Sequence, residues 1–194
     1  MRIAGILLAA GEGARFGGGK LLARLPASAH GVSAGTPIGA ASAMHMMSAL
    51  NDVVAVIRPR DGMLEHALVA TGARVVQCDR AHEGMGASLA CGVRACLDAD
   101  GWIVALADMP WIAPTSIVAV ADAIRDSAEL AAAQYQGKRG HPVGFSRKYG
   151  ALLASLTGDE GARTLVAARQ WALRLVDVDD PGVLRDVDRP ADLA

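Results

Sequence analysis

Two basic side chains, Arg15 and Lys20, stand in a glycine-rich loop close to the start of the sequence. The loop, residues 11–20, holds five glycines, which allow a backbone to approach an anion and to point its N–H groups at it. An apolar run, residues 3–8, precedes the loop and is short enough to be a strand buried on both faces. A plain turn has no use for two cations, so the loop is predicted to bind phosphate groups.

Two well-known phosphate-binding loops do not fit this segment. A Walker A loop needs glycine five residues before its Gly-Lys pair and serine or threonine after it, but these positions hold Ala14 and Leu21. A dinucleotide fingerprint needs a small residue at position 16, which is Phe16. What remains is a third pattern, in which Leu-Ala-Ala-Gly is followed by Arg-Phe-Gly and then by Lys.

A carboxylate, Asp108, comes just past a second apolar run, residues 102–106. The carboxyl edge of a parallel sheet is where open α/β folds hold their ligands, so Asp108 is the strongest candidate metal ligand. The alternative is a cap for the helix predicted at residues 114–126. That helix already has Thr115 and Ser116 near its start as capping candidates.

A second pair of glycines, Gly84 and Gly86, precedes a helix predicted to run to about residue 97. The free N–H groups and the dipole of a helix N-terminus favour an anion or the edge of a base. Ser88, in the first turn, is predicted to cap the helix or to contact the ligand. The alternative is that these residues serve only as turn and cap.

The charges of the second half of the chain are unevenly spread. Residues 136–142 are predicted to form a basic hairpin in which Arg139 and His141 suit an anionic acceptor; the alternative is an ordinary charged hairpin. Arg147 and Lys148 follow as a further basic pair that would receive phosphates. Acidic residues crowd the C-terminal part, where some could hold a metal or all could form a solvated face: Asp177, Asp179, Asp180, Asp186 and Asp188.

The elements that must position these groups alternate along the chain. Strands are predicted at residues 3–8, 53–57, 74–78, 102–106, 129–135, 143–145 and 173–178. Helices are predicted at residues 37–50, 62–71, 83–97, 114–126 and 146–156, and another begins after residue 157 with Asp159 as its cap. Residues 183–188 are predicted to be extended. The pattern predicts an α/β fold, a three-layer α/β/α sandwich with a Rossmann-like, mostly parallel sheet and an antiparallel addition.

Composition narrows the class of protein. A chain of 194 residues is predicted to form a single domain, residues 1–194, and its 52% hydrophobic content includes no apolar run of membrane length. A net charge of −1 argues against nucleic acid as a partner. Three cysteines without a Cys-x-x-Cys spacing predict buried free thiols and, with no signal peptide apparent, a cytoplasmic protein.

Residues 27–36 lack a periodic pattern and are predicted to be a flexible surface insertion. His45 is predicted to be a packed or surface side chain.

With these segments placed, the chain resembles the MobA-like NTP transferase family, a nucleotide-diphospho-sugar transferase-like fold, and within it the molybdenum cofactor cytidylyltransferases. The segments that carry the resemblance are spread from end to end: residues 8–20, 83–89, 107–110, 140–145, 158–163 and 186–193, with 180–184 introducing the last. Each is weak alone, whereas six in the same order point to the family. Ala107 stands where the family usually has glycine, and residues 27–36 are longer than is common, but neither departure removes a charged group.

The resemblance implies roles for named residues. Leu8, Ala9, Ala10 and Gly11 would meet the base and ribose of a nucleotide, and Arg15 and Lys20 its phosphates; Gly13, Gly84, Gly86 and Ser88 complete the predicted nucleotide site. Asp108 would hold Mg²⁺, with Asp188 as a second metal-side position, and Arg15, Lys20 and Asp108 would be the catalytic residues. Relatives that use GTP show Leu-Ala-Gly-Gly in the first segment, so Ala10 favours CTP. Arg139 and His141 are predicted to bind the acceptor.

The implied reaction is transfer of CMP from CTP to the terminal phosphate of a molybdopterin-type cofactor, giving the cytosine dinucleotide form and pyrophosphate. A molybdenum hydroxylase is the implied recipient of the product, and neither nucleic acid nor a membrane is an expected partner. One alternative keeps the chemistry but uses GTP or another phosphorylated acceptor. The other is a non-catalytic carrier of the cofactor, which would need neither Lys20 nor Asp108.

Overall fold

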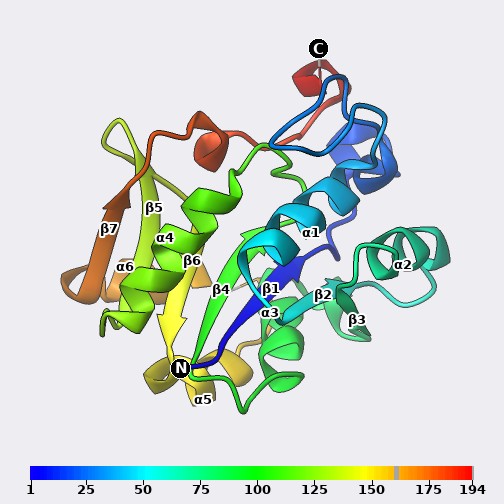
Figure 1. Ribbon diagram of the computed structural model, residues 1–194. Helices are drawn as coiled ribbons and strands as arrows, with labels where there is room; N and C mark the ends of the chain where they lie inside the picture. The colour runs from blue at the N-terminus through cyan, green and yellow to red at the C-terminus, as the bar shows by residue number, and fades with distance from the viewer. Residues whose placement is uncertain (160–161, 194) are drawn as a thin grey trace.

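The computed structural model describes residues 1–159 and 162–193 and contains a seven-stranded sheet between two layers of helices (Figure 1). The strands are β1 (Ile3–Leu8), β2 (Val53–Ile57), β3 (Arg74–Gln77), β4 (Gly101–Leu106), β5 (Leu130–Tyr135), β6 (Lys138–Ser146) and β7 (Leu173–Asp177), in the order β3-β2-β1-β4-β6-β5-β7. Among the described strands only β6 runs antiparallel to its neighbours. The predicted α/β sandwich is confirmed, and its antiparallel strand lies inside the sheet rather than at an edge.

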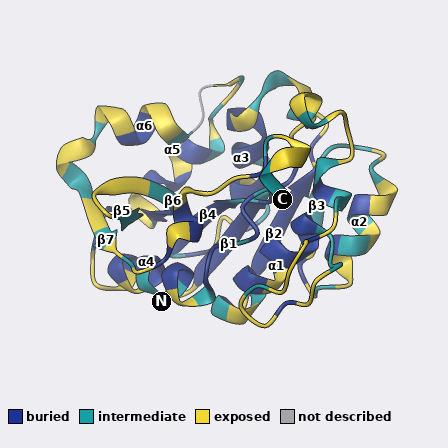
Figure 2. Cartoon of the chain, turned by 90° about the horizontal axis from the view of Figure 1, so that it is seen from above, coloured by how far each residue is buried: buried dark blue, intermediate teal, exposed yellow. Residues whose placement is uncertain are grey.

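The helices cover both faces of this sheet (Figure 2). One face carries α1 (Ile38–Ala49), α2 (Gly62–Val69) and α4 (Pro114–Arg125); the other carries α3 (Met85–Arg94), α5 (Gly150–Ala154) and α6 (Ala162–Ala168). Side chains alternate between the two apolar layers along each strand, as Ile6 and Leu7 do in β1. None of the described helices has both the length and the apolar character of a membrane span.

The predicted elements agree with these bounds to within a few residues, with one difference at the start of β6. The turn between β5 and β6 takes only Gln136 and Gly137, both with positive φ (48° and 75°), which matches a two-residue hairpin. Arg139 and His141 therefore lie in β6, which begins at Lys138 and not at residue 143 as predicted. Residues 160–161, which belong to the segment singled out around the start of α6, lie outside the described residues.

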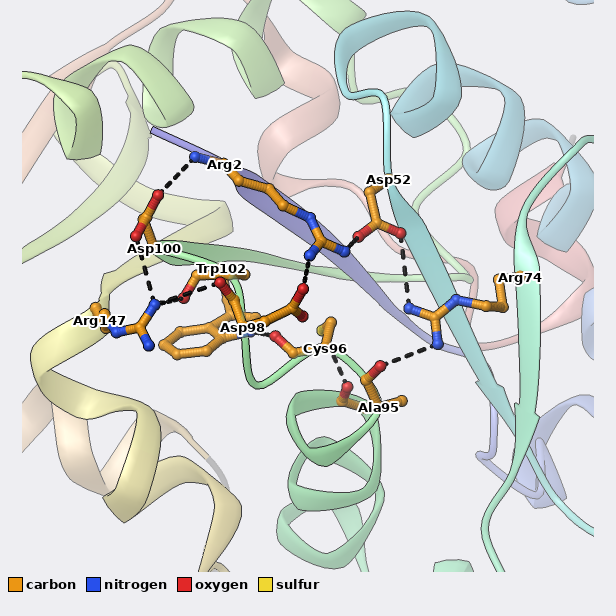
Figure 3. Close-up of polar contacts among 11 residues, drawn as sticks. Arg2, Asp52, Arg74, Ala95, Cys96, Asp98, Asp100, Trp102 and Arg147 are labelled. Atoms are coloured by element: carbon orange, nitrogen blue, oxygen red, sulfur yellow. Dashed lines mark hydrogen bonds and ion pairs between the residues drawn. The ribbon is translucent and has the colours of Figure 1, made fainter.

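Charged side chains form a network at the amino ends of the strands, opposite the edge where β1 and β4 end (Figure 3). Arg2 pairs with Asp52 (Nη2–Oδ2, 2.6 Å) and with Asp98, while its backbone N–H donates to Asp100. Arg147 joins the network through Asp100. The prediction that Arg147 and Lys148 receive phosphates is wrong, because Arg147 serves this network and the Lys148 ammonium lies 2.6 Å from Glu129 Oε1.

The segment at residues 27–36 differs from the predicted flexible surface insertion, because it is folded and packed. The backbone groups of Ala29 and Val32 exchange hydrogen bonds of 2.9 and 2.8 Å, and Val32 is only 4% exposed within the core. His45 is buried on α1, as a packed histidine, and its Nε2 lies 3.1 Å from the carbonyl oxygen of Ala29. This segment therefore contributes to stability.

Val32→Ala is expected to lower the free energy of unfolding by roughly 1 to 3 kcal/mol, because it deletes buried methyl groups and leaves a cavity. Urea unfolding of the purified variant measures this change. Ser33→Ala, at an exposed neighbouring position, serves as the matched control and is expected to leave stability nearly unchanged. Equal stabilities for the two variants would mean that the segment packs loosely.

The C-terminal segment is fixed against α4 through the buried carboxylate of Asp180. Asp180 Oδ2 accepts from the Ala113 N–H (2.8 Å) and the Ser116 hydroxyl (2.7 Å), and Oδ1 accepts from the Gly182 N–H (2.9 Å). Asp180 is therefore a helix cap, neither a metal ligand nor part of a solvated face. Residues Pro181–Leu184 form a 3-10 helix rather than the predicted extended piece, and a Cβ at Gly182 would lie 1.9 Å from the Trp111 carbonyl oxygen.

Candidate active site

Two basic and two acidic side chains meet at the carboxyl edge of the sheet. The Lys20 ammonium lies 2.6 Å from Asp108 Oδ2 and 3.7 Å from Asp188 Oδ1, and Arg15 Nη1 lies 2.9 Å from Asp188 Oδ2. Lys20 and Asp108 are mostly buried, with side chains 12% and 20% exposed, so their attraction is stronger than it would be in water. As predicted, the charged side chains of three segments that are far apart in sequence meet here: the glycine-rich loop, the end of β4 and the C-terminal segment.

The backbone explains why these side chains meet. The Val187 N–H donates to the Asp108 carbonyl oxygen (2.9 Å), which holds the C-terminal segment beside the end of β4. In Figure 1 this segment, in red, ends beside the blue loops of the N-terminal part of the chain. Arg15 stands in a single 3-10 turn bounded by Gly13 and Gly17, whose φ values of 60° and 91° are unfavourable for other residues. Three backbone segments therefore fix the four charges.

A cavity of about 430 Å³ opens next to Lys20 and Asp108. Seven of the predicted nucleotide-site residues line it: Leu8, Ala10, Gly11, Lys20, Gly84, Ser88 and Asp108. The described lining leaves out Ala9, Gly13, Arg15 and Gly86. Such a volume is ordinary for a ligand-binding cavity.

Sequence reasoning missed several residues of this cavity, namely Glu12, Arg58, His82, Glu83 and Asp159. A signal for Arg58 was available, because Arg58 directly follows the buried strand β2. Asp108 was found by the same argument at the end of β4. Glu12, Glu83 and Asp159 lie in segments that carry the family resemblance, although no role was predicted for them in the site; His82 follows no comparable pattern.

The backbone N–H groups at the start of α3 already have hydrogen-bond acceptors within the chain. The N–H groups of Gly86 and Ala87 donate to the Gly158 carbonyl oxygen at 2.9 and 3.3 Å, and the Met85 N–H donates to Asp159 Oδ1 at 3.2 Å. The prediction that this helix offers free N–H groups to an anion is therefore wrong. Asp159, predicted to cap the following helix, places Oδ1 at the start of α3; the residues through which it would cap that following helix, 160–161, lie outside the described residues.

A second cavity of about 410 Å³ adjoins the first, and Leu8, Met85 and Leu106 line both. Its polar lining comes from Arg139 and His141, the two predicted acceptor residues, and from Arg163. The rest of its described wall is mainly apolar: Leu89, Val104, Val143, Ala162 and Val166. Arg163, on α6, lies in one of the family-like segments but had no predicted role.

His141 is a neutral hydrogen-bonding group in this wall. Burial lowers the pKa of its imidazole, and the Val104 backbone and the charge of Asp108 offset only part of that effect. Among the described residues its Nδ1 finds no hydrogen-bond partner, although it is buried. His141 thus contributes to the wall of the second cavity a buried imidazole with one ring nitrogen left unpaired by the described residues.

The free energy of unfolding is expected to fall as pH drops below 6.5. Burial lowers the pKa of both His45 and His141, so the native state keeps them neutral while the unfolded chain takes up protons at its ordinary pKa of 6.5. Urea unfolding over this pH range measures the slope. His45→Gln should flatten it, whereas His66→Gln, at an exposed site, should not. Identical slopes in both variants would contradict a neutral buried His45.

The residues present fit a divalent cation. Within the described part of the chain, Asp108 Oδ1 is buried without a hydrogen-bond partner, and the carboxylates of Asp108 and Asp188 both contact the Lys20 ammonium. The described residues contain no cluster of three or more His, Cys, Asp or Glu side chains able to hold a metal. Mg²⁺ is commonly bound by one or two carboxylates together with water and substrate phosphates, so Asp108 and Asp188 suffice.

A three-layer α/β/α fold with a cation-bearing glycine-rich loop facing two carboxylates defines a nucleotidyltransferase. The chain belongs to the MobA-like NTP transferase family: the model of the MobA-like NTP transferase domain matches residues 5–175. The predicted family and enzyme class are thereby confirmed.

Named relatives cover almost the whole chain. The purine catabolism protein PucB of Bacillus subtilis is 31% identical over 96% of this chain and 91% of its own length. Nicotine blue oxidoreductase of Paenarthrobacter nicotinovorans is 28% identical over 96% and 92%. The crystal structure of Rv0371c from Mycobacterium tuberculosis superposes with a TM-score of 0.80 at 27% identity, covering 99% of this chain and 95% of that one. Rv0371c has also been solved in complex with manganese (TM-score 0.72, 25% identity, 99% and 96% covered).

Proposed function

We propose that this nucleotidyltransferase transfers CMP from CTP to the terminal phosphate of a molybdopterin-type cofactor, giving the cytosine dinucleotide form and pyrophosphate. The choice of CTP is supported by Ala10, which lines the first cavity where family members that use GTP have glycine. Leu8, Ala10 and Gly11 would contact the base and ribose there. Arg15 and Lys20 would bind the phosphates.

The acceptor would occupy the second cavity. Its mainly apolar wall suits a flat ring system, and Arg139 and Arg163 supply positive charge for a phosphate. The neutral imidazole of His141 would orient the ring system by a hydrogen bond. Because the two cavities share Leu8, Met85 and Leu106, the acceptor phosphate and the α-phosphate of CTP would lie next to each other.

The chemistry needs positioning and neutralisation more than a general base. An oxygen of the acceptor phosphate, already an anion, attacks the α-phosphorus; a P–O bond forms there as the bond to the β-phosphate breaks and pyrophosphate leaves. Lys20 and Arg15 offset the negative charge that develops on the leaving group. Mg²⁺ held by Asp108 and Asp188 would supply further positive charge at the phosphate oxygens.

The observation that carries this proposal is the 2.6 Å contact between Lys20 and Asp108 at the mouth of the first cavity. A non-catalytic carrier has no use for this pair. The test incubates the protein with Mg²⁺, molybdopterin and CTP, GTP, ATP or UTP in turn and measures pyrophosphate release. Of the four nucleotides, only CTP should support rapid release of pyrophosphate. A preference for GTP, or release only with another phosphorylated acceptor, would redirect the proposal; no release at all would favour the carrier.

Three broader proposals accompany this one. Residues 1–194 would act as a single MobA-like NTP transferase domain, which one continuous sheet supports. The protein would work in the cytoplasm, where nucleotides are available; three free cysteines suit a reducing compartment. A molybdenum hydroxylase would receive the product, with no part for nucleic acid or a membrane.

A further inference from the structure

The Lys20 ammonium occupies the position between the two proposed metal ligands. It lies 2.6 Å from Asp108 Oδ2 and 3.7 Å from Asp188 Oδ1, and among the described cations it alone pairs with both carboxylates. Its side chain is only 12% exposed, so water screens these contacts little. A cation therefore already stands where a divalent ion would bind.

The charges of this group are balanced without a metal. Lys20 and Arg15 together carry two positive charges, and Asp108 and Asp188 carry two negative ones. A divalent ion added beside an unmoved Lys20 would meet like charge at close range, which is unfavourable in a partly buried site. Metal binding and the observed position of Lys20 thus oppose each other.

Of the two partners in the shortest contact, Lys20 is the one free to move. Asp108 lies two residues past the end of β4, and its carbonyl oxygen accepts from the Val187 N–H, which fixes its backbone. The lysine side chain is a flexible four-carbon stem that carries a compact charge. Arg15 cannot take the same place, because its exposed side chain (76%) pairs with Asp188 alone among the described carboxylates.

We propose that Lys20 is the resident counter-ion of the Asp108–Asp188 pair and competes with the divalent metal for it. A metal ion binds weakly to the nucleotide-free enzyme because it must displace this ammonium group. The inference rests on the proposed function only in taking these two carboxylates as the metal site. It holds whichever nucleotide or acceptor the enzyme uses.

The test titrates Mn²⁺ against the whole protein without nucleotide, following free Mn²⁺ by electron paramagnetic resonance. Lys20→Met removes the charge and keeps much of the stem, and should raise the affinity for Mn²⁺ about tenfold or more. Arg24→Met is the matched control, since Arg24 is an exposed cation close in sequence that bonds the Gly35 carbonyl oxygen. It should leave the affinity unchanged. Circular dichroism checks that each variant is folded, and Lys20→Gln replaces Lys20→Met if that variant does not fold.

Two outcomes would overturn the proposal. One is an affinity for Mn²⁺ that stays within about threefold of the parent protein, or falls, when Lys20 is replaced. The other is a gain that persists in the double variant Lys20→Met/Asp108→Asn, because the ion would then bind elsewhere. Neither experiment contains CTP or an acceptor, so failure of cytidylyl transfer and failure of this inference are distinguishable.

Discussion

Asp108→Asn is expected to abolish turnover, with a fall in kcat of about 10³-fold or more, while the fold stays intact. Asparagine keeps the size of the side chain but removes the charge that faces Lys20 and Asp188 and that a divalent ion requires. Pyrophosphate release with CTP, molybdopterin and Mg²⁺ measures the loss. Thermal unfolding of the same preparation checks the fold.

The matched control for this variant is Asp179→Asn. Asp179 is exposed in the same acidic C-terminal region as Asp188 but lines neither cavity described. Its replacement should leave kcat unchanged. Full activity of Asp108→Asn would remove Asp108 from the metal site and with it the proposed mechanism.

Lys20→Ala is expected to lower kcat by about 10²-fold or more, as loss of a single electrostatic donor to a developing anion does elsewhere. The ammonium lies beside the first cavity, within reach of a bound triphosphate, so its loss leaves negative charge on the leaving pyrophosphate less well compensated. Single-turnover measurements with CTP separate this chemical effect from slow product release. Arg24→Ala is the corresponding control.

A loss of kcat below about threefold would mean that Lys20 only stabilises the loop.

Lys20 is proposed both to compete with the metal ion and to stabilise the leaving pyrophosphate, and together these two roles make a prediction that neither makes alone. Removing the charge should strengthen binding of Mn²⁺ to the free protein and yet slow turnover. If Lys20 merely supported the metal site, its removal would lower both the affinity for Mn²⁺ and the rate of turnover.

The sheet and the meeting of charges at its edge were predictable from sequence for one physical reason. Strands buried on both faces appear as short apolar runs, and the carboxyl ends of parallel strands share an edge. Lys20 and Asp108, in loops after β1 and β4, therefore had to lie near each other once these strands were paired. The position of Asp188 came instead from the family resemblance.

The predictions that failed concern contacts between distant segments. Asp180, one of the acidic residues predicted to hold a metal or to form a solvated face, instead accepts hydrogen bonds at the start of α4, a helix that begins more than sixty residues earlier in the chain. A single sequence shows a capping residue only when it is close to the helix that it caps. The packing of Val32 was missed for a similar reason, because its neighbours give no periodic pattern.

The dependence of the site on the C-terminal segment has a consequence for biosynthesis. Asp180 and Val187 hold that segment against the start of α4 and the backbone of Asp108, and the same segment carries Asp188. A nascent chain on the ribosome that lacks these residues already carries all seven strands but not Asp188, one of the two carboxylates proposed to bind the metal. Under that proposal the enzyme becomes active only after translation has passed residue 188, and termination shortly before it should yield an inactive polypeptide.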